Sequence, residues 1–150
     1  MSLPGRSSVH GVSLLMFIAP LIAMISGCSN QLTVEPGAYG SSDFCNELSA
    51  SLPVTISDQL IRSTSSDSSG VAAWGDPAII LRCGVDKPAS IQPTSQLITV
   101  NGIDWYPEEL TQGQRFTSMN TQQFVEVNIP LEYQPASGIL VDLEIAFPTN

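Results

Sequence analysis

The ten residues from Leu97 to Tyr106, LITVNGIDWY, contain the clearest structural signal in the chain. Two apolar runs, Leu97–Val100 and Ile103–Tyr106, flank the pair Asn101-Gly102. Asn and Gly both tolerate positive φ, and an Asn-Gly pair between such runs is the strongest short-range indication of a β-hairpin. The stretch therefore predicts an antiparallel hairpin inside a β-rich domain.

Segments on both sides of this hairpin extend the predicted sheet. Short apolar or alternating runs predict strands at Ala78–Cys83, Arg115–Ser118 and Phe124–Ile129. Pro130 follows the last of these runs and ends it, because proline cannot donate to a sheet ladder. The polar, low-complexity run 63–70 reads as an exposed loop.

Two segments favour helices and complete the expected fold. In Asp43–Leu52 the apolar side chains recur every four residues with Cys45 on the same face, and Pro53 ends the segment. Ile139–Phe147 fits both a strand and one face of a helix. We favour the helix, because its acidic residues are poor strand formers. The expected fold class is α+β: a small two-layer domain with an antiparallel sheet packed against an N-terminal helix and, on this choice, a C-terminal one.

The N-terminal segment has the pattern of a signal peptide. Arg6 precedes an apolar run, Val12–Ile25, of 14 residues. This run is short for a membrane-spanning helix and suits a signal-peptide core. The next residues complete the sequence Ile25-Ser26-Gly27-Cys28, which resembles the lipobox of bacterial lipoproteins, with Ile25 where that pattern prefers Leu.

The lipobox resemblance implies cleavage before Cys28 and a diacylglycerol on its sulfur. We expect residues 1–27 to be removed, 28–42 to form a flexible tether and 43–150 to form a single domain. Two acyl chains would anchor the protein stably, whereas one chain gives only marginal binding. The alternatives are a secreted protein cleaved near Gly27 and an uncleaved membrane helix.

The three cysteines suggest one lipidation site and one disulfide. With Cys28 lipidated, Cys45 and Cys83 remain as an even pair in an oxidising compartment. A reactive thiol or a metal ligand are the alternatives. A thiolate nucleophile usually needs a base or a cation beside it, and the chain's one histidine, His10, lies in the signal segment.

The charge of the chain after Cys28 excludes some partners. It holds all 14 acidic residues and four basic ones, Arg62, Arg82, Lys87 and Arg115, for a net charge of −10. Such a charge argues against nucleic acid and against electrostatic docking on anionic lipid. The diacylglycerol on Cys28 would therefore supply membrane attachment, and the charge itself supports solubility or the binding of a cationic partner.

Several short runs in a fixed order resemble a known family. They include AAWGDP at 72–77, LRCGV at 81–85, VNGIDW at 100–105 and VEV at 125–127. Together they resemble the DUF3515 family of uncharacterised actinobacterial secreted proteins and lipoproteins, over about Cys45 to Phe147. The chain departs mildly, with Ile61 where the family tends to have a basic residue and Ala78 where it often has proline. The resemblance implies an actinobacterial envelope protein and no established activity.

Candidate site residues are few, and each has a structural alternative. Carboxylates beside aromatic side chains after the hairpin turn could bind sugar or serve as a glycosidase pair; these are Asp104, Trp105, Tyr106, Glu108 and Glu109. Trp74 and Asp76 could line a small pocket, and Arg82 could pair inside the domain or face a partner. The alternative is that both tryptophans pack in the core and the acids are solvated.

Other chemistry finds little support in the sequence. The chain after Cys28 has no histidine for a Ser-His-Asp triad, no zinc-type spacing and no phosphate-binding loop. We therefore expect no cofactor, no metal and no catalytic residue. The expected function is a lipid-anchored, non-catalytic binding or accessory module on the outer face of the plasma membrane, or a secreted one without lipidation. Its partner would be an envelope protein or wall component. The alternatives are a carboxylate-dependent hydrolase of wall glycan and a carrier of a small ligand or cation.

Overall fold

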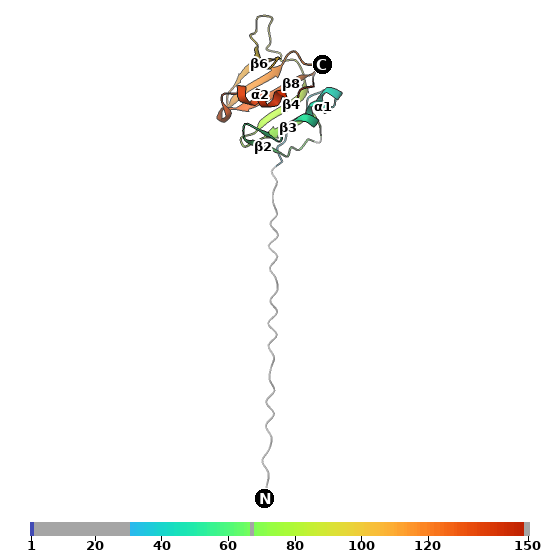
Figure 1. Ribbon diagram of the computed structural model, residues 1–150, viewed down its shortest axis with the longest axis vertical. Coiled ribbons are helices and arrows are strands. Elements are labelled where there is room, and N and C mark those ends of the chain that lie inside the picture. Colours follow the sequence, from blue (N-terminus) through green and yellow to red (C-terminus); the bar gives the residue numbers. More distant parts are fainter. Residues whose placement is uncertain (2–30, 67, 149–150) are drawn as a thin grey trace.

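The computed structural model describes residue 1 and residues 31–66 and 68–148 (Figure 1). Its elements are, in chain order, α1 (Asp43–Ser51), β1 (Thr55–Ile56), β2 (Gln59–Arg62), β3 (Val71–Trp74), β4 (Ile79–Val85), β5 (Ile98–Val100), β6 (Ile103–Leu110), β7 (Gly113–Ser118), β8 (Phe124–Pro130), the 3₁₀-helix η1 (Leu131–Tyr133) and α2 (Ser137–Glu144). Cys28 lies outside the described residues. Within them, no helix is both long and apolar enough to cross a membrane.

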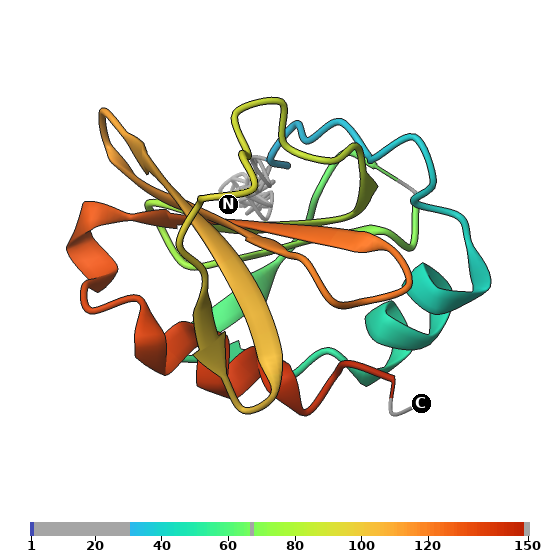
Figure 2. The ribbon, with the colours of Figure 1, turned by 90° about the horizontal axis from the view of Figure 1, so that it is seen from above.

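The strands form one eight-stranded sheet in the order β1-β2-β3-β4-β8-β7-β6-β5. All neighbouring strands are antiparallel. Strands adjacent in sequence pair with each other, except β4 and β5, and the pairing of β4 with β8 joins the two halves. Both helices lie on the same side of the sheet (Figure 2). The expected small α+β domain, with its sheet packed against two helices, is confirmed.

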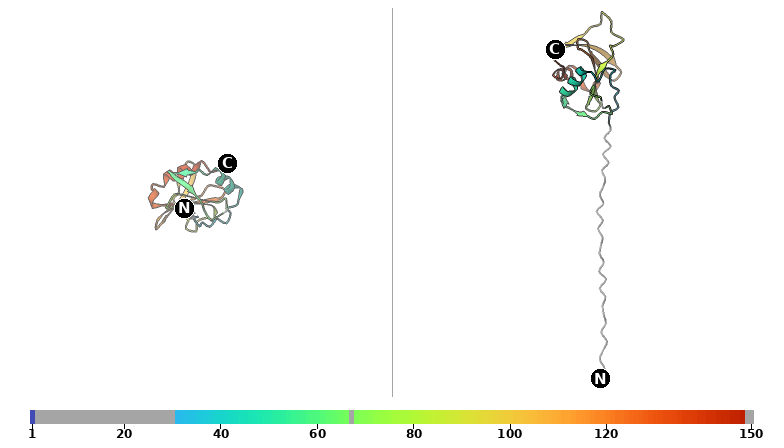
Figure 3. Two further views of the ribbon diagram at one scale, coloured as in Figure 1. Left: turned by 90° about the horizontal axis from the view of Figure 1, so that it is seen from below. Right: turned by 90° about the vertical axis from the view of Figure 1, so that its right-hand side faces the viewer.

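The core lies between the sheet and the helices. Apolar side chains on one face of the sheet meet the buried sides of both helices in a single cluster. The largest fully buried side chains in this cluster include Trp74, Trp105, Leu48, Ile56, Ile79, Leu81, Ile129, Ile139, Leu140 and Leu143. The side view at the right of Figure 3 shows α1 covering this face. Burial of these side chains stabilises the two-layer arrangement, because apolar area leaves water.

The expected disulfide is present between Cys45 and Cys83. It joins α1 to β4 across 38 positions of sequence, with the two Cα atoms 5.7 Å apart. Both cysteines are fully buried within the core cluster. The bond therefore ties the N-terminal helix directly to a central strand.

Local signals place the helix ends and the hairpin well. Ser42 caps α1, since its Oγ accepts a hydrogen bond from Cys45 N at 3.3 Å. The Asn101-Gly102 hairpin is confirmed, with Val100 opposite Ile103 and both turn residues at positive φ. The C-terminal segment is helical, as favoured, but α2 spans Ser137–Glu144 rather than the predicted 139–147.

The flexible tether predicted for 28–42 is wrong for the part that the structure describes, 31–42. Leu32 forms a parallel bridge with Thr64, and Val34 is 8% exposed. Tyr39 N donates to Gly84 O at 2.9 Å, and a Cβ on Gly37 would lie 2.4 Å from the Gly84 carbonyl carbon. The glycines that suggested flexibility instead allow the backbone of this segment to pack closely on the backbone of β4, where a side chain would not fit.

Some strands were not predicted, and others differ in length from the prediction. β1 and β2 form a short hairpin where the sequence was ambiguous, with Ser57 and Asp58 in the left-handed turn. β6 continues to Leu110 through Pro107, and β7 begins at Gly113. Pairing with neighbouring strands, rather than local propensity, determines these bounds.

Candidate functional site

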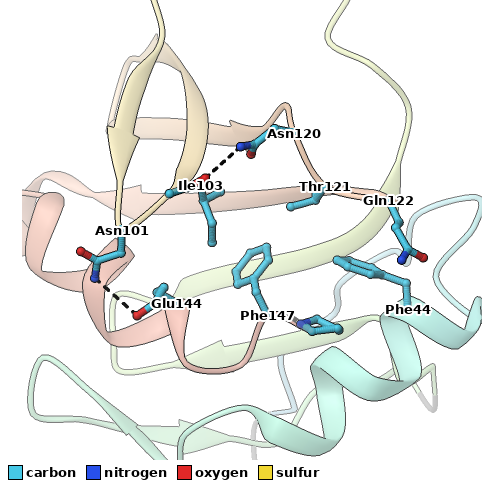
Figure 4. Close-up of a pocket in the computed structure, with 10 residues that line it drawn as sticks. Phe44, Asn101, Ile103, Asn120, Thr121, Gln122, Glu144 and Phe147 are labelled. Carbon is cyan, nitrogen blue, oxygen red and sulfur yellow. Dashed lines mark hydrogen bonds between the residues drawn. The ribbon is translucent and has the colours of Figure 1, made fainter. Parts of the chain in front are cut away.

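One pocket lies where four separate parts of the chain meet. α1 contributes Phe44, the β5–β6 turn contributes residues 101–103, the β7–β8 loop contributes residues 120–122, and the end of α2 with the following residues contributes Glu144, Phe147 and Pro148. The pocket has a volume of about 190 Å³. Figure 4 shows these side chains around a common opening. None of these parts adjoins another in sequence.

Hydrogen bonds hold the hairpin turn in place on two sides of the pocket. Asn101 Nδ2 donates to Glu144 Oε2 at 3.4 Å, which connects the turn to the end of α2. On the other side, Asn120 Nδ2 donates to Gly102 O at 2.9 Å (Figure 4). The Oδ1 atom of the same Asn120 accepts from Asp104 N at 2.9 Å. The polar rim is therefore positioned by the protein itself.

A core tryptophan packs against the apolar wall of the pocket. Phe147 packs edge-to-face on Trp105, with ring centroids 5.7 Å apart and an interplanar angle of 86°. Such aromatic pairs add to the stabilisation that comes from burial. Trp105 is fully buried, and the rings of Phe44 and Phe147 lie together on one side of the pocket (Figure 4). The core thus sets the position of the wall.

The chemistry of the lining is mixed and carries little charge. Aromatic and aliphatic surfaces come from Phe44, Ile103 and Phe147, while amides and a hydroxyl come from Asn101, Asn120, Gln122 and Thr121. Glu144 is the one carboxylate among the lining residues. Small-molecule sites typically combine apolar walls with a few oriented polar groups. This lining suits a small ligand with an apolar face and several hydrogen-bonding groups.

The five candidates on β6 do not form one cluster. Trp105 enters the core, whereas Asp104, Tyr106 and Glu108 alternate with it toward the opposite face of the strand. Asp104 accepts from Thr99 Oγ1 at 2.6 Å, and Glu108 accepts from Ser90 Oγ at 2.6 Å. Tyr106 donates to the same Ser90 Oγ at 3.3 Å.

Glu109 is separated from Glu108 by the geometry of the strand. Its carboxylate accepts from Gln114 Nε2 at 2.6 Å on β7. Adjacent residues of a strand point to opposite faces, so these two glutamates do not face a common cleft. Neither lines the pocket described above.

Trp74 and Asp76 also lie away from the pocket. Trp74 is fully buried, and its indole Nε1 donates to Pro53 O at 2.9 Å. Trp74 belongs to the same core cluster as the disulfide cysteines. The exposed Asp76 carboxylate lies 3.7 Å from Arg62 NH1. Both residues have structural contacts at the β3–β4 turn.

Arg82 pairs inside the domain. Its Nε donates to Glu35 O at 2.7 Å, and its NH1 contacts Glu126 Oε1 at 3.2 Å. Arg115 Nε approaches the other oxygen of Glu126 at 3.4 Å and donates to Asn128 Oδ1 at 3.0 Å. Glu126 is only 7% exposed, so two guanidinium groups compensate one buried carboxylate. This network joins β4, β8 and β7 on the sheet face opposite the helices.

The described residues contain no group of three or more His, Cys, Asp or Glu side chains placed to hold a metal ion. Sequence reasoning missed the pocket, although it identified the Asn101-Gly102 turn that forms part of its rim. The lining residues carry no motif. Only the two turn asparagines, Asn101 and Asn120, give a weak local signal.

The fold and the pocket define a small α+β domain with an open antiparallel sheet, two helices on one face and a lateral cleft at the helix ends. A family model described as "Protein of unknown function (DUF3515)" matches residues 10–146, and the chain belongs to this family. The resemblance inferred from the short sequence runs is therefore confirmed. No curated protein and no solved structure matches the chain.

Proposed function

We propose that this protein is a lipid-anchored, non-catalytic binding domain on the outer face of the plasma membrane, in an actinobacterial cell envelope. Its pocket would hold a small neutral part of an envelope partner or wall component. The observation that carries the proposal is the pocket lining, in which Phe44 and Phe147 form an apolar wall beside amides from separate loops. The anchor itself rests on the lipobox-like run that ends at Cys28.

Binding to soluble cell-wall fragments tests the pocket. Titration of the purified protein, followed by calorimetry or by NMR shifts of the lining residues, should give saturable binding. Gln122→Ala and Glu144→Gln should each weaken it about tenfold, the effect of losing roughly one good hydrogen bond. Glu132→Gln, an exposed acid outside the pocket, is the matched control and should bind like the unaltered protein. Equal affinity in all variants would reject the pocket as the binding site.

A carboxylate-dependent hydrolase of wall glycan is the second candidate. The pocket lining supplies one carboxylate, Glu144, while a glycosidase of the usual kind needs two across the scissile bond. Incubation with purified cell wall should therefore release no soluble fragments. Release that disappears in Glu144→Gln, Glu108→Gln or Glu109→Gln would favour the hydrolase instead.

The anchor has its own test. Radiolabelled fatty acid should be incorporated into the full chain and not into Cys28→Ala. Undiminished labelling of that variant would reject lipidation at this cysteine. Crosslinking in intact cells should then recover one specific envelope component if the domain acts as an accessory module.

A further inference from the structure

The described chain enters the domain beside β2. Leu32 N donates to Ser63 O at 3.2 Å, and Ser65 N donates to Leu32 O at 2.9 Å. These bonds join the start of the described chain to the segment that directly follows β2. Figure 1 and the right panel of Figure 3 show this end of the domain opposite the β4–β5 loop. The position of residue 31 on the domain surface is therefore defined.

The chain length between Cys28 and residue 31 limits how far the domain can stand from the membrane. Three residues reach at most about 11 Å when fully extended. The head-group layer on each side of a bilayer is roughly 5–8 Å thick. This inference rests on the proposed lipidation of Cys28. With Cys28 lipidated, the surface around residue 31 must lie at or just above the head groups. A longer tether would have allowed the domain to hang free.

Exposed aliphatic side chains lie on this same end. Leu60 is 68% exposed and Ile61 45% exposed on β2, and the neighbouring Val54 is 65% exposed. Ile61 N donates to Val54 O at 2.8 Å, so these two residues lie side by side, while Leu60, the preceding residue of β2, points to the other face of the strand. We call Val54, Leu60 and Ile61 the hairpin patch. Thr64, which pairs with Leu32, is three residues beyond Ile61 and so within roughly 10 Å of it along an extended chain.

The charges around the hairpin patch indicate what kind of contact it makes. Asp58 lies in the hairpin turn, and Asp76 is paired with Arg62 at 3.7 Å. With a chain charge of −10 after Cys28, attraction to anionic lipid does not hold this surface in place. Exposed aliphatic side chains can instead enter the boundary between head groups and acyl chains, where binding strength follows buried apolar area.

We propose that the sheet edge formed by the β1–β2 hairpin faces the bilayer that carries the Cys28 acyl chains, so that the hairpin patch reaches its interface with side chains from both faces of β2, Leu60 on one face and Ile61 on the other. The domain then has a defined orientation on the membrane, with the β1–β2 hairpin toward the lipid and the β4–β5 loop away from it. The covalent anchor supplies affinity, and the hairpin patch supplies orientation.

Tryptophan fluorescence in vesicles tests this orientation. The lipidated full chain is reconstituted into phosphatidylcholine vesicles with and without brominated acyl chains, in two variants, Leu60→Trp and Gln92→Trp. Gln92 is exposed in the β4–β5 loop and is the matched control. The native Trp74 and Trp105 are fully buried and give a constant background. Bromine should quench about half of the added signal in Leu60→Trp, as expected for insertion to about 5–10 Å, and leave Gln92→Trp unchanged.

Flotation of the same vesicles separates the two proposals. A full chain that does not float with lipid overturns the lipid anchor itself. A chain that floats, yet shows equal quenching in both variants or none in Leu60→Trp, overturns the docking of the hairpin patch alone. A photoreactive residue at position 60 gives a second measurement in cells: an adduct with phospholipid supports the proposal, and capture of a protein in its place overturns it.

Discussion

Replacing both Cys45 and Cys83 with alanine should destabilise the domain by about 4 kcal/mol, according to the chain-entropy model for a loop of this size. The loop spans 38 sequence positions and ties α1 to β4. Without the bond, the unfolded chain gains freedom, while the folded chain keeps most of its contacts. For a domain of this size the melting temperature should fall by roughly 15 °C.

Reversible urea unfolding measures this loss. Trp74 and Trp105 are fully buried and report unfolding by fluorescence. The comparison belongs in a Cys28→Ala background, which removes the third thiol, and in the presence of reductant for any variant with a free cysteine. The slope of the unfolding free energy against urea should also rise, since the unlinked chain exposes more surface.

Single replacements provide the control for this prediction. Cys45→Ala and the double variant should agree within about 0.5 kcal/mol, because each removes the same bond. A loss below about 1 kcal/mol in the double variant would refute the reasoning, since it would mean that the crosslink hardly restricts the unfolded chain.

Three further substitutions test the packing of the domain. Glu126→Gln should lower the unfolding free energy by roughly 1–3 kcal/mol in urea titrations, because it leaves Arg82 and Arg115 without their shared carboxylate. We expect the lower part of this range, since both guanidinium groups are partly exposed and water screens the ion pairs. An unchanged urea midpoint would contradict this account of the network. Gly37→Ala should detach the segment 31–42 from β4, because its Cβ would lie 2.4 Å from the Gly84 backbone; faster hydrogen exchange of Tyr39 N would report it, and unaltered protection would show that the close contact is dispensable. In Gly102→Ala the new Cβ would have no atom within 4 Å, so only the strain of a positive φ should lower the unfolding free energy, by about 1 kcal/mol. A loss several times larger in the same titration would contradict this prediction.

Signals confined to neighbouring residues predicted their structures well. The Asn101-Gly102 hairpin and the helix that ends before Pro53 could be inferred because turn chemistry and helical periodicity act over short distances, and the cysteine pair could be inferred from the number of cysteines. The choice between strand and helix for 139–147 was harder. Ile139, Leu140 and Leu143 share the buried face of α2, while Val141 is 45% exposed, and only packing against the sheet revealed which period applies.

Proximity in sequence does not bring the candidate residues on β6 into one site. Trp105 and Glu108 are three residues apart, yet one enters the core and the other bonds Ser90. The segment 31–42 was predicted wrongly for a different reason: its glycines indicate flexibility in isolation, but in the fold they allow close packing on distant backbone. The error over 31–42 comes from contacts with distant residues, which no local window contains, whereas the separation of the side chains on β6 follows from strand alternation.

The sequence alone determined the class of the domain, its cysteine pair, its Asn101-Gly102 hairpin and its family resemblance. The tertiary structure decided the order of the strands, the partners of Arg82 and the location of the pocket. These depend on residues far apart in the sequence, such as Arg82 and Glu126, which are 44 positions apart and in contact. Local chemistry limits which elements form, whereas burial of one shared core decides which distant side chains those elements bring together.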